Sequence, residues 1–269
     1  MEVEFETPEE PGADQKDRRL VVRSLIPNGI TVLALCAGLT AMRFAMAGQF
    51  ERAVVAIIVA SILDGLDGRA ARLLKGTTKF GAELDSLTDF VNFGVSPVMV
   101  LYIWSMQELG GIGWIAVLGY AICCALRLAR FNVALDDPDK PEWTANYFVG
   151  VPAPAGAWLV MLPLYLSFLG LVNLNHVPVL IAAYSLFIGF LMISRIPTFS
   201  GKKMRIRLGR EWVLPILLGV GLVAAMSLNF PWHTLCLIAF IYLGFIPFSL
   251  SRYRRHMAED ARLDVSSLP

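Results

Sequence analysis

Residues 61–97 read SILDGLDGRAARLLKGTTKFGAELDSLTDFVNFGVSP, a stretch that joins two apolar blocks and carries four aspartates. Asp64 and Asp67 are three residues apart at the end of the first block, and Asp85 and Asp89 are four apart near the start of the second. Residues at these spacings share one face of a helix. Two antiparallel helices joined by a turn at Lys75–Thr78 would therefore bring all four carboxylates together.

The rest of the chain consists mainly of long apolar blocks. Of its 269 residues, 56% are hydrophobic and 17% are charged, whereas soluble domains carry about 25% charged residues. A membrane-spanning helix needs about 20 mostly apolar residues. The blocks of suitable length are 26–47, 50–68, 86–106, 112–132, 150–172, 178–195, 212–229 and 231–250. The sequence predicts an all-α, polytopic transmembrane helical bundle of about eight spans.

Basic residues alternate with the apolar blocks and predict the orientation of the chain. Lys and Arg occur at 16–23, 69–79, 127–130, 195–210 and 252–262, but are absent from 105–113 and 171–177. The positive-inside rule places basic segments on the cytoplasmic side. An even number of spans then places both termini in the cytoplasm. Residues 1–23 are acidic at their start, unlike a signal peptide, and are predicted to form a disordered cytoplasmic tail.

The four aspartates predict a metal site. A carboxylate at membrane depth costs about 2.5–3.5 kcal/mol, so four of them need a compensating charge. The stretch offers only oxygen ligands, which favours Mg²⁺ or Mn²⁺ over zinc. Two divalent cations would neutralise four carboxylates. The net charge of +1 gives no indication of nucleic-acid binding.

Small residues and one arginine accompany the aspartates. The small residues are Gly65, Gly68, Ala70, Ala71 and Gly81. They let a phosphate or nucleotide approach the backbone closely, and Arg72 could donate to a phosphate. The same small residues could serve only helix packing. The acids and Arg72 could instead form a structural ion-pair network, or the acids could line a proton or cation pathway.

The order of these residues is specific. The stretch reads Asp64-x-x-Asp67-Gly68-x-x-Ala71-Arg72, then eight residues, then Gly81-x-x-x-Asp85-x-x-x-Asp89. This order resembles the full signature of the CDP-alcohol phosphotransferase family, with no departure at its eight fixed positions. The resemblance implies six core helices, two divalent metals, a CDP-linked donor and a homodimer.

Roles for individual residues follow from the resemblance. It implies that Asp64, Asp67 and Asp85 are the principal metal ligands and that Asp89, also near the metals, acts on the incoming hydroxyl. Residues 27–31, Pro-Asn-Gly-Ile-Thr, resemble the segment that opens the first helix of the family. The donor-binding residues predicted in this way are Asn28, Thr31, Gly68, Ala71, Arg72 and Gly81.

Three later segments resemble one branch of the family. Residues 125–132, 148–155 and 194–200 look like segments that mark the bacterial and archaeal phosphatidylserine synthases. The resemblance implies transfer of a phosphatidyl group from CDP-diacylglycerol to L-serine in the cytoplasmic (inner) membrane of a prokaryote. It also implies a membrane core over 24–210, two additional spans over 211–251, and a cytoplasmic tail over 252–269.

Arg127 and Arg130 are the candidate acceptor-binding residues. They are three residues apart at the inner end of the fourth span, and the serine carboxylate suits the two-pronged guanidinium. Both could instead extend to the membrane interface.

Two other functions remain open from the sequence. A sister enzyme could use glycerol 3-phosphate or inositol phosphate, whose phosphate would suit the arginines equally well. An ion-coupled transporter would also need buried acids. It would spread them over several helices at the midplane, whereas here they gather at one surface.

Overall fold

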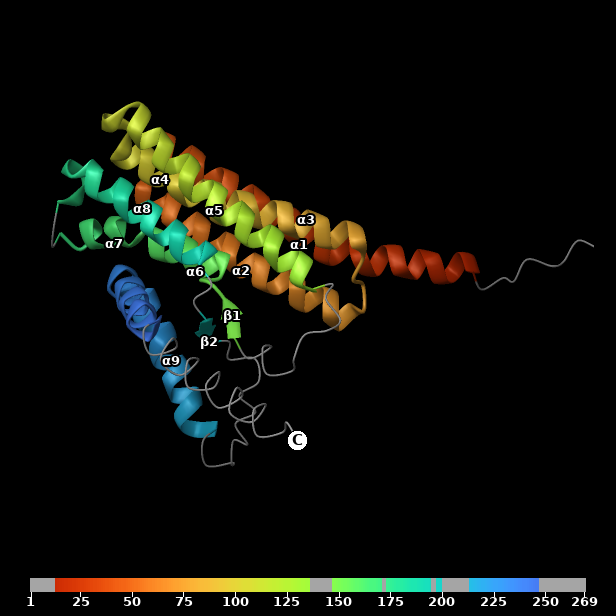
Figure 1. Cartoon of the computed structure of the whole chain (residues 1–269). Helices are drawn as coiled ribbons and strands as arrows, with labels where there is room; N and C mark the ends of the chain where they lie inside the picture. The colour runs from red at the N-terminus through yellow and green to blue at the C-terminus, as the bar shows by residue number, and fades with distance from the viewer. Residues whose placement is uncertain (1–12, 136–146, 171–172, 195–196, 200–212, 247–269) are drawn as a thin grey trace, which may run out of the picture.

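Figure 1 shows a computed structural model of the chain, in which residues 13–135, 147–170, 173–194, 197–199 and 213–246 are described. The first half contains α1 (Ala13–Met46), α2 (Phe50–Leu74), α3 (Lys79–Asp89), the π-helical segment η1 (Phe90–Val95), α4 (Ser96–Trp104), the 3₁₀ turn η2 (Met106–Leu109) and α5 (Gly111–Leu135). The second half contains β1 (Tyr147–Val149), α6 (Ala153–Val160), α7 (Leu162–Phe168), the 3₁₀ turn η4 (Leu174–His176), α8 (Pro178–Ile193), β2 (Pro197–Phe199), α9 (Val213–Asn229) and a last helix, Pro231–Ile246.

These elements form an all-helical membrane protein, as predicted. Within the described residues, three helices are long and apolar enough to cross a bilayer: Arg23–Met46, Lys79–Trp104 and Gly111–Ala134. Shorter apolar helices are Ala153–Phe168, Pro178–Ile193, Leu214–Asn229 and Pro231–Ile246. α2 is equally long, but Asp64, Asp67 and Arg69 interrupt its apolar character. These charged residues therefore reduce the membrane-span signal of α2.

Helices α1 to α8 pack side by side in one bundle (Figure 1). α1 and α2 contact each other along much of their length, and α5 packs against α8. Large, completely buried side chains fill the space between helices, among them Ile57, Phe93 and Tyr120. Many other large apolar side chains are exposed, as expected where helices face lipid.

Several helix ends differ from the prediction. α1 begins at Ala13, which corrects the predicted disordered tail for residues 13–23, while residues 1–12 lie outside the described part. Apolar composition marks only the part of a helix that faces lipid, so charged turns beyond it were missed. The third helix begins at Lys79, ahead of the apolar block 86–106 and directly after the predicted turn at 75–78. The predicted fifth span is divided at Met161, two residues before Pro163. The tail 252–269 lies outside the described residues.

The rod from Lys79 to Trp104 contains a π-helical segment in its middle. Pro97 lacks the backbone N–H that would bond the carbonyl of Phe93, and its ring crowds that carbonyl. The hydroxyl of Tyr120 on α5 donates to the Phe93 carbonyl instead, at 3.1 Å. The Ser96 hydroxyl bonds the Val91 carbonyl at 2.9 Å. Hydrogen bonds from side chains therefore stabilise the change from α-helical to π-helical geometry directly after Asp89.

Two features lie outside this bundle of helices. β1 and β2 pair antiparallel, with Phe148 opposite Thr198, which adds a short ribbon to a chain predicted to be all-α. The last helix packs on α7 through Trp232, whose ring lies 4.6 Å from that of Phe168. Most described side chains of α9 are exposed.

Candidate functional site

The turn between α2 and α3 places the two pairs of aspartates opposite each other. The C-cap of α2 is Lys75, which adopts a left-handed conformation (φ 51°). α3 is capped by Thr78, whose hydroxyl accepts a hydrogen bond from the Gly81 N–H at 3.0 Å. The predicted turn at 75–78 is thus confirmed, and its tight geometry keeps the C-terminal end of α2 beside the N-terminal end of α3.

Three of the four carboxylates form a compact cluster. One oxygen from each of Asp64, Asp67 and Asp85 lies within 4.8 Å of the others. Asp67 is only 3% exposed. Asp89, one turn deeper than Asp85, has its carboxyl group within hydrogen-bonding reach of Asp64. The structure therefore brings together all four aspartates that the sequence singled out.

Some oxygens of these carboxylates have no partner in the protein and could bind a cation. Oδ1 of Asp67 and Oδ1 of Asp89 are buried and have no hydrogen-bond partner in the structure. None of the four aspartates forms an ion pair with a Lys or Arg of the described residues, which argues against the structural ion-pair network. Carboxylates this close repel each other unless a cation or a proton lies between them. An all-oxygen cluster with unpartnered oxygens fits a hard divalent cation.

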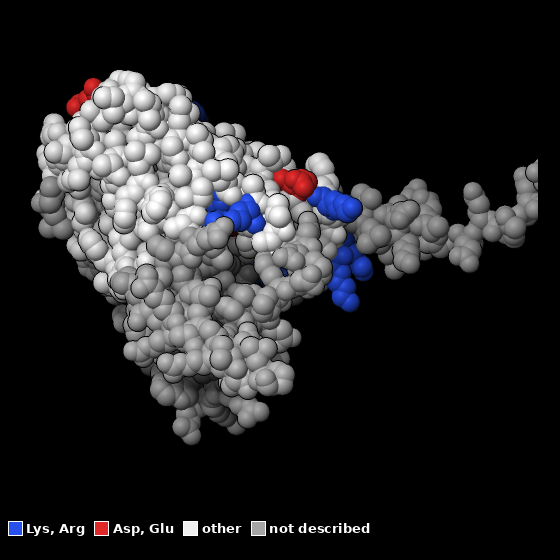
Figure 2. Space-filling view, viewed as in Figure 1, with Lys and Arg blue, Asp and Glu red and all other residues white. Residues whose placement is uncertain are grey.

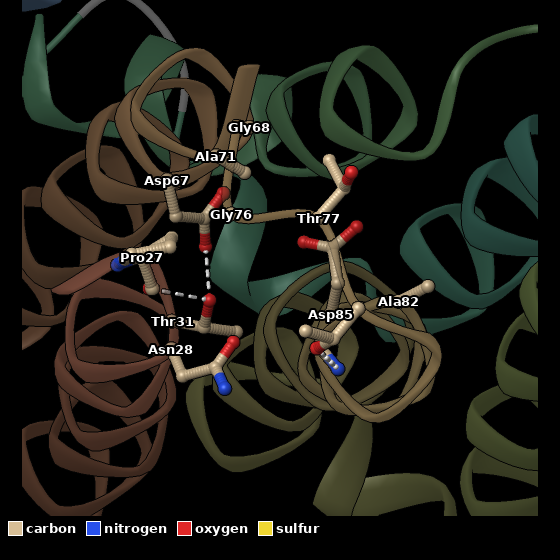
Figure 3. A pocket seen from close by; sticks show the side chains of 12 residues that line it. Pro27, Asn28, Thr31, Asp67, Gly68, Ala71, Gly76, Thr77, Ala82 and Asp85 are labelled. Carbon is tan, nitrogen blue, oxygen red and sulfur yellow. Dashed lines mark hydrogen bonds between the residues drawn. The ribbon is translucent and has the colours of Figure 1, made fainter. Parts of the chain in front are cut away.

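A cavity of about 190 Å³ opens beside the cluster, between α1, α2 and α3. Figure 3 shows Asp67 and Asp85 projecting toward it from facing helices. Its lining includes these predicted donor-site residues: Asn28, Thr31, Gly68, Ala71 and Gly81. Arg72 is absent from the lining, because its Nε donates to the Gly68 carbonyl at 3.0 Å on the exposed side of α2.

Contacts with α1 explain two features of this cavity. The Thr31 hydroxyl donates to Oδ2 of Asp67 at 2.7 Å and lies 3.0 Å from the Pro27 carbonyl. A Cβ at Gly81 would come within 2.8 Å of the Asn28 amide oxygen, so a larger residue at Gly81 would displace the Asn28 side chain. Pro27 lies inside α1 rather than at its start, which corrects the prediction of a helix start there.

The turn contributes cavity residues that the sequence did not single out. Gly76, Thr77 and Thr78 line the cavity. A Cβ at Gly76 would lie 2.5 Å from the Arg23 carbonyl oxygen, so the turn lies directly against α1. This segment lies between the two halves of the aspartate motif, and that position could have indicated that it lines the cavity.

The two candidate arginines occupy different surroundings. Arg127 is 9% exposed, its Nε has no hydrogen-bond partner, and it is close enough to Asp89 for electrostatic attraction. Its guanidinium also lies 5.9 Å from the centre of the Phe131 ring. Arg130 is less buried and donates through Nη2 to the Ile193 carbonyl at 2.7 Å, at the end of α8. Arg127 therefore faces the carboxylates, whereas Arg130 joins α5 to α8.

Exposed positive charge surrounds the same end of the bundle. In Figure 2 most of the visible described surface is uncharged, and Lys and Arg gather mainly toward the end from which α1 protrudes. The exposed Lys and Arg residues at this end of α1–α3 are Arg23, Arg69, Arg72, Lys75 and Lys79. Such a cluster of cations suits a membrane surface rich in anionic lipid.

Comparison with known proteins decides the family. A sequence profile described as CDP-alcohol phosphatidyltransferase matches residues 24–197, which contain the whole carboxylate cluster and its cavity. The chain belongs to this family. A second profile, CDP-alcohol phosphatidyltransferase 2, matches residues 211–247, the region of the two C-terminal helices.

Relatives within the CDP-alcohol phosphatidyltransferase family share a single name. A protein from Mycobacterium leprae is 41% identical over 244 residues, which cover 89% of this chain and 79% of the relative. One from Helicobacter pylori is 36% identical, covering 68% of this chain and 76% of the relative. One from Methanocaldococcus jannaschii is 34% identical, covering 66% and 76%. All three are named CDP-diacylglycerol–serine O-phosphatidyltransferase.

Proposed function

We propose that this chain is a CDP-diacylglycerol–serine O-phosphatidyltransferase, which makes phosphatidylserine and releases CMP. The observation that carries the proposal is the match to the Mycobacterium leprae relative of that name over 89% of the chain. The cluster of Asp64, Asp67 and Asp85 supports it, because transfer of a phosphoryl group needs charge stabilisation at the phosphate.

The donor is proposed to bind in the cavity between α1, α2 and α3. Asn28 and Thr31 would face its nucleotide, while Gly68, Ala71 and Gly81 would leave space for the pyrophosphate. Arg72 is proposed to contact a phosphate after leaving the Gly68 carbonyl, since one exposed hydrogen bond holds it. A cavity at the inner end of apolar helices lets the nucleotide remain in water while the acyl chains remain in lipid.

The residues present fit a metal centre with Asp64, Asp67, Asp85 and Asp89 as ligands. We propose two divalent cations, Mg²⁺ or Mn²⁺. When bound, they would polarise the pyrophosphate and stabilise negative charge on the departing CMP. Thr31 keeps the Asp67 carboxylate oriented through its 2.7 Å hydrogen bond.

Asp89 is proposed as the general base. The serine hydroxyl gives its proton to the Asp89 carboxylate, a bond forms between the serine oxygen and the phosphorus bearing the diacylglycerol, and the bond from that phosphorus to CMP breaks. The electron pair of the broken bond leaves with CMP. The position of Asp89, deeper than Asp85 and beside Arg127, suits a group that acts on the acceptor rather than on the nucleotide.

Arg127 and Arg130 are proposed to bind the serine carboxylate. Arg127 lies nearest to Asp89 and retains an unpartnered Nε, so it can receive the carboxylate while the hydroxyl faces Asp89. Arg130 uses Nη2 at the end of α8 but keeps other N–H groups for the acceptor. An acceptor carrying a phosphate would suit these arginines as well, so the relatives, and not the arginines, favour serine.

The cellular setting is proposed on the distribution of charge. We propose about eight spans in the inner membrane of a prokaryote, with both termini in the cytoplasm, and assembly as a homodimer. The basic residues at the inner ends of α1–α3 support this orientation.

The proposal is tested with purified protein in mixed micelles containing CDP-diacylglycerol, L-serine and Mg²⁺ or Mn²⁺. We expect phosphatidylserine and CMP in equal amounts. CMP release with a phosphorylated alcohol, but not with serine, would move the chain to a sister activity. Absence of CMP release with any acceptor would contradict the enzymatic assignment.

A further inference from the structure

Asn92 is a completely buried amide without hydrogen-bond partners. Its exposed fraction is 0%, and neither Oδ1 nor Nδ2 is hydrogen-bonded in the structure. An unpaired buried polar atom destabilises the folded protein. Asn92 carries two of them in the interior of a helical bundle, where an apolar side chain would avoid that cost.

The surroundings of Asn92 are shaped around its side chain. A Cβ added to Gly38 on α1 would overlap the Asn92 amide oxygen and would lie 2.9 Å from Cγ. Nearby, the Ser96 hydroxyl donates to the Gly38 carbonyl at 3.0 Å, which joins α1 to this part of the rod. Gly38 therefore leaves space for the amide and keeps α1 close to it.

Asn92 also lies close to Asp89 along the chain. It follows Asp89 by three residues, within the first turn of the π-helical segment that begins directly after Asp89. Oδ1 of Asp89 is itself buried and without a partner. Donor and acceptor groups that each lack a partner thus lie within one turn of each other along the rod. π-Helical segments such as Phe90–Val95 are often found at functional sites.

We propose that Asn92 is a positioning residue for the transfer reaction. Its amide holds one buried water that bridges to Oδ1 of Asp89, which fixes this carboxylate with its other oxygen toward the acceptor. A buried water needs two to four polar partners, and the amide together with Asp89 supplies them. The inference rests on the proposed role of Asp89 as base, but not on the identity of the acceptor.

The decisive variants change the amide without removing the side chain. Asn92→Leu keeps branching at Cγ but removes both polar atoms. We expect kcat to fall about tenfold to a hundredfold, the range found for residues that orient catalytic ligands. The KM for CDP-diacylglycerol should change little, and the melting temperature should stay near the native value, since an apolar side chain of similar shape fills the same space. Asn92→Ser keeps a hydroxyl and space for water, so its kcat should remain near that of the native protein.

Gly38→Ala provides a reciprocal test. The new methyl group displaces the Asn92 amide, so kcat should fall as in Asn92→Leu. In the double variant with Asn92→Ser the clash is relieved, and kcat should return toward the Asn92→Ser level. Such non-additivity identifies a direct contact. Val98→Ala, a buried apolar change in the same rod, is the control for general loosening, with a lower melting temperature and a nearly native kcat.

The assays use whichever acceptor the native chain turns over best, so a wrong assignment of serine would leave the comparison intact. A stable Asn92→Leu variant with native kcat would overturn the proposal. So would equal losses of kcat and melting temperature in Asn92→Leu, Asn92→Ser and Val98→Ala, since that pattern indicates packing alone.

Discussion

The Thr31 hydroxyl donates to Oδ2 of Asp67 at 2.7 Å across the interface between α1 and α2. This bond fixes the most buried carboxylate of the cluster, at 3% exposed, and leaves its other oxygen free. The first helix therefore contributes to the metal centre without supplying a carboxylate. A residue that only orients a ligand is expected to change metal affinity more than it changes the fold.

Thr31→Val keeps the shape of the side chain and removes this donor. We expect half-maximal activity to need about tenfold to a hundredfold more Mn²⁺, while Thr31→Ser stays close to native. Thr40→Val is the matched control, since Thr40 bonds only the Cys36 carbonyl of its own helix. The measurement is the activity of all three variants as a function of Mn²⁺ concentration. Identical curves for Thr31→Val and Thr40→Val would remove Thr31 from the site.

The carboxylates themselves should be indispensable. Asp64→Asn, Asp67→Asn and Asp85→Asn should each lower turnover at least about a hundredfold, because each removes charge that holds a catalytic cation. Asp89→Asn should lose about 10²–10⁴-fold as a missing general base. Glu83 is exposed on α3, the helix that carries Asp85 and Asp89. Glu83→Gln is therefore the control and should remain active. Excess chelator should abolish native activity and added Mn²⁺ restore it; full activity in chelator contradicts the metal proposal.

Substitution of Arg127 should change the KM for serine but not the KM for CDP-diacylglycerol. Arg127→Lys keeps the charge but loses the two-pronged geometry, so the KM for serine should rise about tenfold while that for CDP-diacylglycerol changes little. Arg127→Ala should be worse. Ethanolamine, which lacks the carboxylate, should be a poor acceptor whose KM does not respond to either change. An equal rise in the KM for serine and the KM for CDP-diacylglycerol would indicate that Arg127 has only a structural role.

Arg130 should show a second effect. Because its Nη2 bonds the Ile193 carbonyl at the end of α8, Arg130→Ala should lower the melting temperature as well as raise the KM for serine. A loss of stability with an unchanged KM for serine would make Arg130 a purely structural link between α5 and α8.

Cysteine labelling tests the orientation of the chain. In a background without the four native cysteines, Gln15→Cys and Ser267→Cys should react only from the cytoplasmic side. Gln107→Cys should react from the outside; it is exposed in η2 and avoids the positive φ of 57° at Gly110. Labelling of Gln15→Cys and Ser267→Cys from opposite sides would mean an odd number of spans.

The sequence predicted the centre of the molecule better than its edges. Asp64 and Asp85 lie close together because helical periodicity and a four-residue turn leave few other arrangements, and both features are local in sequence. The start of the first helix at Ala13 was missed because hydropathy reports contact with lipid and not the extent of a helix.

Side-chain partners between distant segments were harder to predict. The hydrogen bond of Arg130 to α8, the return of Arg72 onto Gly68, and the contact of Gly38 with Asn92 all depend on how helices are placed relative to each other. The π-helical segment depends on Tyr120 from another helix, so Pro97 alone could not reveal it.

Competition between acceptors tests the central claim most directly. Native protein with CDP-diacylglycerol and Mn²⁺ is given equal concentrations of L-serine, glycerol 3-phosphate and inositol phosphate, and the lipid products are resolved by mass spectrometry. The account predicts phosphatidylserine as the dominant product, lost in chelator and in Asp89→Asn. A dominant phosphorylated product, or phosphatidylserine formed equally well by Asp89→Asn without metal, would contradict it.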